Sequence, residues 1–394
     1  MTLRLGFKAV FAAATILVLT NDVQAQAQSN YEDMRRDANK NLFTIVTSGL
    51  QTAYAKFGAD IAETLNGLLG SNTRVLAMLS EGGGQNVLDM YLLRGVDGGV
   101  ISPEEVKWLQ RKDPARYGNL GQRINYIIKL FDFKLHIIAK RDITSLEQLR
   151  GKKVSCLKAI STAAILCENI FLALGIDAQI VNDAVPVAMQ KLKSGEIAAA
   201  VRGGPTPLPG FETVKPEDNL HFIPIDAAHL PNSPFDKIKN DYLPARLRAS
   251  EYPTMITDGQ DVPSLATPAV LGVYGWPAGS ERYKNVENFV QVFFGNIDKF
   301  AGPPRHPGWK DINIAADVAG MIRFPAAQKW LDDKRKSQGY AATAVSPDEN
   351  LKKAFADFMT KYVRGKGGAA ISESEKAEMW RQFQEWSAQT LSSR

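Results

Sequence analysis

The sequence predicts an α/β protein with two lobes, a hinge between them and an added C-terminal helical extension. Three observations carry this prediction. Short β-branched runs alternate with amphipathic helical runs, the alternation starts again after a basic helical region, and a late extended run leads back to the first lobe. The 394 residues are 45% apolar and 23% charged, which is ordinary for a globular chain with two cores.

The first residues predict export. Arg4 and Lys8 precede the apolar run "AVFAAATILVLT" and the small-residue stretch "NDVQAQAQ", which together have the three parts of a signal peptide. An apolar run of about 12 residues is too short to span a bilayer, because a spanning helix needs roughly 20. We therefore expect a signal peptide over 1–25, cleaved after Ala25 or Ala27, and a secreted protein that is periplasmic in a Gram-negative source.

The first lobe is expected over 40–135. Strand candidates at 42–48, 74–80 and 97–102 alternate with two helical patterns. This β-α-β-α-β order predicts parallel strands whose loops open at one carboxyl edge, the place where open α/β sheets bind ligands. The apolar positions expected to face the core are Phe57, Ile61, Leu65 and Leu68 in the first helix and Val87, Tyr91 and Leu92 in the second.

The second lobe is expected over 136–265. The extended run "FKLHIIAK" leads into it, and "TSLEQLRG" predicts a capping box of Thr144 with Glu147. Strand and helix then alternate again; Ser161 is the expected cap of a helix that stops at Gly175. The strand "EIAAAVRGGPTP" ends in a Gly-Gly-Pro turn, so this lobe also has ligand-accessible loops at its carboxyl edge.

A proline-rich region over 205–268 suppresses long helices, with a short helix expected at 235–243. The strand "TPAVLGVYGW" and the helix "NVENFVQVFFGNIDKF" then return the chain to the first lobe, over 266–333. Two chain crossings, near 131–139 and 266–276, would form a hinge beside a cleft. The helix should bury one side, made of Val286, Phe289, Val290, Phe293 and Ile297.

No catalytic or metal-binding pattern is present in the sequence. There is no GxSxG, GxGxxG or Walker motif, the four histidines are scattered, and His136 falls on a strand position. Cys156 and Cys167 either form a bridge, which an oxidising compartment permits, or are two small buried side chains. We therefore expect no enzyme activity, no cofactor and no metal.

These residues resemble a known family, the TAXI-type solute receptors of TRAP transporters, within the type 2 periplasmic-binding-protein fold. The resemblance spans about 42–333 and lies in the order and spacing of "TSGLQTAYAKFGADIA", "SEGGGQNVLDMYLLRGVDGGVIS", "GEIAAAVRGGPTP", "FGNIDKF" and "IRFPAAQKWLDD". It implies a receptor that captures a small organic anion or amino acid between two lobes and delivers it to a TRAP-type membrane permease. It implies no nucleic-acid partner.

The resemblance also implies the binding positions. Two departures stand out: Gly84 lies where a serine is common, and Thr52 replaces a usual glycine. Carried over residue by residue, the first two turns supply Ser48, Gly49, Thr52, Tyr54, Gly82, Gly83 and Gly84, and the second lobe supplies Ser161 and Thr162.

Physical chemistry independently predicts an anion at these turns. A helix N-terminus offers unpaired N–H groups and about half a positive charge, and small residues let a carboxylate approach closely. Lys158 and Arg202, the latter before Gly203 and Gly204, are candidate cations, although both could equally be solvated loop residues.

The residues over 334–394 depart from the family. They predict two amphipathic helices joined by "RGKGG", which either cover the first lobe or contact a permease or signalling partner. Two alternative functions remain open from sequence. One is an exported ligand-sensing subunit without transport, and the other is a transferase or lyase on the same bilobal fold.

Overall fold

The computed structural model describes residues 28, 30–69 and 73–337. By its internal contacts the chain divides into two compact units, Met1–Trp330 and Leu331–Arg394, and both predicted lobes belong to the first. The expected signal peptide and the expected helices beyond residue 337 lie outside the described residues. Within these residues no helix has both the length and the hydropathy needed to cross a membrane.

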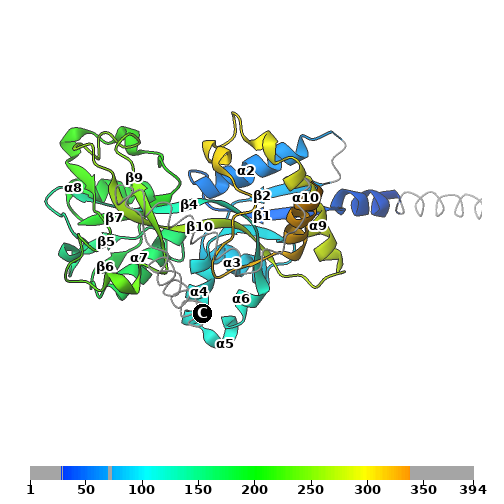
Figure 1. The fold of residues 1–394 in the computed structure, drawn as a ribbon, viewed down its shortest axis with the longest axis horizontal. Coiled ribbons are helices and arrows are strands. Elements are labelled where there is room, and N and C mark those ends of the chain that lie inside the picture. Colours follow the sequence, from blue (N-terminus) through cyan, green and yellow to red (C-terminus); the bar gives the residue numbers. More distant parts are fainter. Residues whose placement is uncertain (1–27, 29, 70–72, 338–394) are drawn as a thin grey trace, which may run out of the picture. The chain divides into compact units, whose positions relative to one another are not determined.

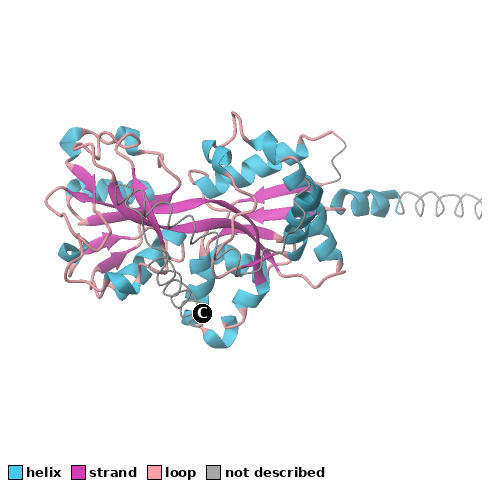
Figure 2. Ribbon diagram, viewed as in Figure 1, coloured by secondary structure: helices cyan, strands magenta, loops and turns pink. Residues whose placement is uncertain are grey.

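The described strands form one mixed, 11-stranded sheet with the central order β2-β1-β3-β10-β4-β7-β5-β6 (Figures 1 and 2). β8 and β11 pair with β4, and β9 pairs with β10. The strands are β1 (Leu42–Val46), β2 (Arg74–Met78), β3 (Gly98–Ile101), β4 (Ile124–Lys140), β5 (Lys153–Ser155), β6 (Gln179–Val181), β7 (Ala199–Gly204), β8 (Leu220–Phe222), β9 (Leu243–Leu247), β10 (Val262–Tyr274) and β11 (Ile322–Arg323).

Helices flank this sheet and precede or follow its strands. The α-helices are α2 (Ala53–Asn66), α3 (Gly84–Leu92), α4 (Pro103–Lys112), α5 (Pro114–Tyr117), α6 (Leu120–Arg123), α7 (Thr162–Ala173), α8 (Val185–Ser194), α9 (Glu281–Gly295) and α10 (Pro325–Ser337). Short 3₁₀ turns are η1 (Leu146–Leu149), η2 (Phe211–Thr213), η3 (Pro216–Asp218), η4 (Phe235–Lys237), η5 (Ile297–Phe300) and η6 (Pro307–Asp311).

The first lobe is built on β1, which pairs in parallel with β2 and β3. Side chains on both faces of β1 are buried, as the β-branched run predicts. Phe43 of β1 stacks on Phe289 of α9 with ring centroids 3.9 Å apart, so the returning helix covers this sheet. A second apolar cluster, which includes Val87, Ile101 and Tyr126, lies under α3 and α4.

Two long strands run through both lobes. β4 and β10 are antiparallel neighbours from Lys134 opposite Ala266 to Ile124 opposite Tyr274. The later part of β4 pairs with β7, whereas its first residues pair with β11. The two extended runs expected to cross between lobes therefore exist and lie side by side, as Figure 1 shows.

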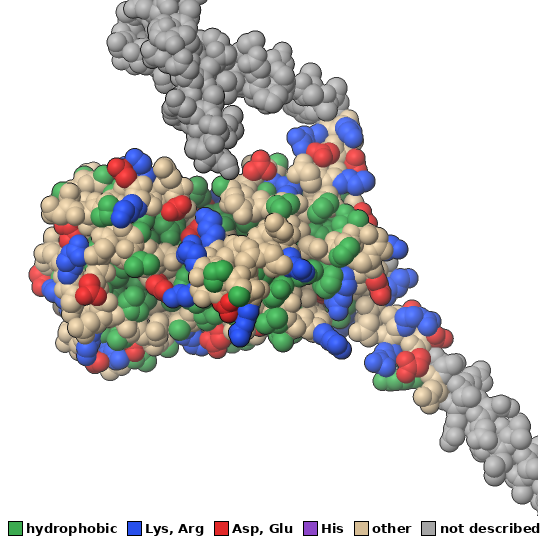
Figure 3. All heavy atoms as spheres, turned by 90° about the horizontal axis from the view of Figure 1, so that it is seen from below, with side chains coloured by type: hydrophobic (Ala, Val, Ile, Leu, Met, Phe, Trp, Pro, Cys, Tyr) green, Lys and Arg blue, Asp and Glu red, His purple; other side chains and the backbone are tan. Residues whose placement is uncertain are grey.

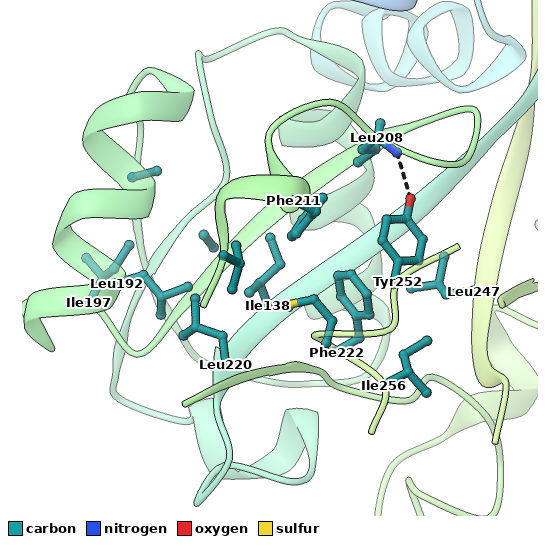
Figure 4. Packing of buried hydrophobic residues seen from close by; sticks show 14 residues of the cluster. Ile138, Leu192, Ile197, Leu208, Phe211, Leu220, Phe222, Leu247, Tyr252 and Ile256 are labelled. Carbon is teal, nitrogen blue, oxygen red and sulfur yellow. Dashed lines mark hydrogen bonds between the residues drawn. The ribbon is translucent and has the colours of Figure 1, made fainter. Parts of the chain in front are cut away.

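The second lobe surrounds β5, β6 and β7, which pair in parallel. Its core, drawn in Figure 4, contains Ile138 of β4, Leu192 of α8, and the aromatic rings of Phe211, Phe222 and Tyr252. Beside it, a disulfide joins Cys156, which follows β5, to Cys167 of α7. The bridge that an exported protein permits is thus formed, and both cysteines are also buried.

The capping prediction at Thr144 and Glu147 is wrong by one residue. Ser145 is the cap, its hydroxyl accepts the N–H of Glu147, and the Gln148 side chain accepts the N–H of Ser145. Two overlapping Ser/Thr-x-x-Glu/Gln matches occur in "TSLEQ", and Glu147 is instead held by Asn232 and Ser233. The turn is a single 3₁₀ turn.

Three further expectations also differ. Leu92 is 62% exposed, because Val87, Met90 and Tyr91 share one face of α3 and Leu92 lies one residue beyond it. The helix expected at 235–243 is reduced to η4, since Leu243 already pairs in β9. The expected face of α9 is buried, but Ile297 lies in the following 3₁₀ turn.

Candidate ligand-binding cleft

One cavity of about 570 Å³ is lined by loops of both lobes. It lies where β1, β2, β5 and β7 end, at the carboxyl edge of the sheet. Twelve of the thirteen residues expected to bind ligand line it: Ser48, Gly49, Thr52, Tyr54, Gly82, Gly83, Lys158, Ser161, Thr162, Arg202, Gly203 and Gly204. The remaining residue, Gly84, lies outside the lining.

The first-lobe wall begins with the turn from β1 into α2. Thr52 has extended backbone angles and caps the helix, with its hydroxyl accepting the N–H of Ala55 at 3.2 Å. Ser48 hydrogen-bonds the same hydroxyl. Ala53 and Tyr54, the first two helical residues, line the cavity, and N–H groups at these positions have no partner within a helix. This turn therefore presents donors to the cavity.

The glycine turn before α3 lines the cavity with Gly82 and Gly83 and also touches the second lobe. Gly83 has φ +57°, and a Cβ there would lie 2.5 Å from the carbonyl oxygen of Ile160 and 2.6 Å from the amide nitrogen of Thr162. Gly84 donates its N–H to Ile160 at 2.9 Å. Because glycine has no side chain, the turn can contact the backbone of the second lobe. The turn is therefore part of the contact between lobes.

The second-lobe wall includes the start of α7. Ser161 caps this helix, accepting the N–H of Ala164 at 3.3 Å, as the sequence predicts. Thr162, the first helical residue, shares a hydrogen bond of 3.0 Å with the hydroxyl of Tyr54. Since Tyr54 is the second residue of α2, this bond links the first turns of two helices from different lobes through the phenol side chain.

A buried carboxyl group lies behind this bond. Glu105 of α4 is fully buried; its Oε2 accepts the N–H of Ser102, and its Oε1 has no hydrogen-bond partner within the described residues. Burial raises the pKa of Glu105 to about 7. Burial, and then the charge of Glu105, raise the pKa of Tyr54 well above its usual value. The sequence signal that was missed is the capping box "SPEE".

The two candidate cations are engaged with protein groups. Lys158 pairs with Glu81 of the other lobe at 2.7 Å, and both side chains are more than half exposed. Arg202 donates to the carbonyl oxygen of Pro209 at 2.9 Å and lies over the ring of Phe211, 4.9 Å from its centroid. Both nevertheless line the cavity, so their charges act on whatever occupies it.

The loop that follows β7, over 205–209, forms an apolar wall of the cavity. Hydrogen bonds on the side away from the cavity hold this loop in place. The N–H of Leu208 donates to the hydroxyl of Tyr252 at 2.7 Å, as Figure 4 shows. Burial lowers the pKa of His136 to about 3, and its Nδ1 faces the carbonyl oxygen of Lys134. Its Nε2 therefore accepts from Tyr252 at 2.9 Å, and this chain of bonds fixes the loop.

Lys56 and His306 are among the lining residues that were missed in the sequence. Lys56 and His306 reach the cavity because the buried Asp60 binds both: it pairs with Lys56 at 3.1 Å and accepts the N–H of His306 at 2.7 Å. Trp309 donates to the same carboxylate. Asp60 and His306 are far apart in the chain, and no local pattern signals their contact. Within the described residues no cluster of acidic, histidine or cysteine side chains forms a metal site.

No protein-family model matches this chain, and no curated protein matches it. Solved structures do show similarity. An ancestral arginine-binding protein bound to arginine has a TM-score of 0.40 and 12% identity over 69% of this chain and 96% of its own. A periplasmic binding protein of an ABC transporter from Brucella ovis, with glutathione bound, has a TM-score of 0.40 and 13% identity over 72% and 80%.

The substrate-binding protein of an amino acid ABC transporter has a TM-score of 0.37 and 9% identity, over 68% of this chain and 96% of its own. At these scores the similarities carry no argument about ligand, partner or family. The α/β fold and its two lobes follow from the topology of the chain itself. The residues of the cleft are the features that indicate a function.

Proposed function

We propose that this chain is an extracytoplasmic solute receptor that binds a small organic anion or amino acid in the cleft between its lobes and delivers it to a TRAP-type membrane permease. The observation that carries the proposal is the cavity, because it is lined by the N-termini of α2 and α7 from opposite lobes. A receptor of this kind performs no chemistry on its ligand, and we assign none to the cleft.

The electrostatics of the cleft support an anionic group. Helix N-termini favour negative charge through the aligned peptide dipoles and the N–H groups without intrahelical partners. The charged side chains in the lining are Lys56, Lys158 and Arg202 against Glu81 and Asp183, an excess of one positive charge. A ligand carboxylate near Tyr54 and Thr162 would then meet donors from both lobes.

The connection between lobes supports a cleft that opens. β4 and β10 are the strands shared by both lobes, and a hinge at two strands allows one lobe to rotate against the other. Direct bonds join the lobes around the cavity, among them Gly84 with Ile160 and Tyr54 with Thr162. Ligand and these bonds would together favour the closed arrangement.

Export and delivery rest on sequence features. The expected signal peptide supports a periplasmic location, and the resemblance over 42–333 supports a TRAP permease as partner. On the face seen in Figure 3, basic and acidic side chains of the described residues are interspersed, as on an ordinary solvated surface. Uptake of ligand that requires both this chain and the permease subunits would establish transport; a ligand response without uptake would assign a sensor.

The experiment that tests receptor function is the identification of the bound compound. Protein purified without detergent from periplasm is denatured, and the released small molecules are measured by mass spectrometry. We expect one compound, near one per chain, that rebinds unchanged to the refolded protein. Conversion of the compound on rebinding would show an enzyme, and the absence of any released or rebinding compound would contradict the proposal.

A further inference from the structure

We infer that the ligand of this cleft is an anion with an apolar body, such as an aryl- or alkyl-carboxylate, and that free α-amino acids are poor ligands. The inference rests on the proposed receptor function and narrows its ligand class. Three features of the lining carry it: one rigid apolar wall, the engagement of both lining acids, and the volume of the cavity.

The apolar wall is the loop "PTPLP" over 205–209, continued by Leu157, Val185 and Phe133. Its three prolines have fixed φ angles. The loop is tied from behind by Leu208 to Tyr252, and Thr206 shares hydrogen bonds with Glu251 and Lys134. A fixed apolar surface of this kind stabilises an apolar ligand body by removing it from water, without first having to become ordered.

An α-amino acid would bring an ammonium group, which needs an acidic partner when it is buried. The acids of the lining are Glu81 and Asp183. Glu81 pairs with Lys158, and Asp183 pairs with Lys191 through Oδ1 at 2.9 Å. The second oxygen of Asp183 is shielded from solvent and has no hydrogen-bond partner within the described residues, so a ligand ammonium group would have to displace neighbouring atoms to reach it. An ammonium group in this cavity would therefore compete with an existing lysine for its partner.

The anionic end has a place at the starts of α2 and α7, whose first turns are linked by the 3.0 Å bond between the hydroxyls of Tyr54 and Thr162. We place the ligand body against the apolar wall, in which the ring of Phe133 lies 6.0 Å from the ring of Tyr54. The cavity of about 570 Å³ falls in the range of about 300–1,000 Å³ that encloses drug-sized ligands, which exceeds the need of a small amino acid.

The test is calorimetric titration of the whole mature protein, stripped of bound compounds, with four probes. They are 4-phenylbutyrate, its neutral amide, L-phenylalanine and L-glutamate. The amide removes the charge. Phenylalanine adds the ammonium group and has one methylene fewer, and glutamate carries the ammonium group with a second carboxylate in place of the apolar body. We expect 4-phenylbutyrate to bind at least tenfold more tightly than each of the other three.

A matched pair of variants locates the apolar contact. Val185 and Val187 lie on the same helix, but only Val185 lines the cavity, while Val187 is exposed. Val185→Ser should weaken 4-phenylbutyrate binding about tenfold, the effect of one or two lost methyl contacts in an apolar pocket. Val187→Ser should leave its affinity unchanged.

The outcomes separate the two claims. Tighter binding of phenylalanine or glutamate would overturn the ligand class and leave the receptor function standing. Equal effects of the two valine variants would overturn the placement of the apolar body. Failure of all four probes to bind at millimolar concentration would also overturn this inference, while the compound released from the native protein decides separately on receptor function.

Discussion

Glu105 is the residue at which the structure makes its sharpest prediction, because a fully buried carboxyl group with an unpartnered oxygen lies at the contact between lobes. Burial raises its pKa from the ordinary value of 4.5 to about 7 in the folded protein. The folded state therefore binds more protons than the unfolded state between these two values. The free energy of unfolding contributed by this group is greatest below about pH 4.5 and falls as the pH rises through 7.

The prediction concerns the difference between the wild-type protein and Glu105→Gln. The wild type should lose up to about 1.4 kcal/mol of unfolding free energy per pH unit relative to the variant between roughly pH 5 and 7. Denaturant unfolding at pH 5, 6, 7 and 8 measures this. The comparison is needed because the lowered pKa values of His221 and His306 give the opposite slope in both proteins. Parallel curves would mean that Glu105 is charged throughout.

Arg202 is the second residue with a definite test. It contacts Pro209 and Phe211 and also lines the cavity. Its loss therefore removes a positive charge beside the ligand and a hydrogen bond that holds the apolar loop. If it pairs with the ligand anion, Arg202→Ala should cost on the order of 2 to 5 kcal/mol of binding free energy. Calorimetry with the released compound measures this, and an effect below about 0.5 kcal/mol would identify a merely structural arginine.

At the scale of elements, α4 and α7 form a second contact between the lobes. Glu168 of α7 accepts from Trp108 at 3.1 Å and pairs with Lys112, and Arg111 donates to Asn169 at 2.9 Å. Because the Lys112–Glu168 pair is largely exposed, Glu168→Ala should weaken the closed arrangement by only about 0.5 to 1 kcal/mol. Ligand affinity should fall two- to fivefold. Glu217→Ala, at an exposed position remote from this contact, is the control; equal affinities for both variants would deny α4 and α7 a role in closure.

The elements also show what could be predicted from sequence. The cap at Ser161 and the β-branched run of β1 follow from local residue patterns, and the structure contains both. The cap at Ser145 was missed because two overlapping motifs are locally equivalent. Contacts across the cleft, such as Gly83 with Ile160 or Asp60 with His306, depend on how distant segments pack, and no periodicity encodes them.

At the scale of the whole molecule, the proposed receptor function requires that the lobes close around ligand. Solution scattering on the mature protein should show a smaller radius of gyration at saturation with the released compound. The reason is that ligand binds both walls at once and so shifts the population towards the closed form. An unchanged radius would mean either a cleft that is closed beforehand or one that does not move.

The ligand is proposed to bind between two lobes, and the contact between these lobes needs the glycine turn at Gly83. Titration of the released compound into Gly83→Ala and Gly95→Ala tests this most directly. Both positions have positive φ, but a Cβ at Gly95 meets nothing within 4 Å, whereas one at Gly83 meets the backbone of Ile160 and Thr162. We expect wild-type affinity for folded Gly95→Ala and at least a hundredfold loss for folded Gly83→Ala. Equal, undiminished affinity in both variants would contradict it.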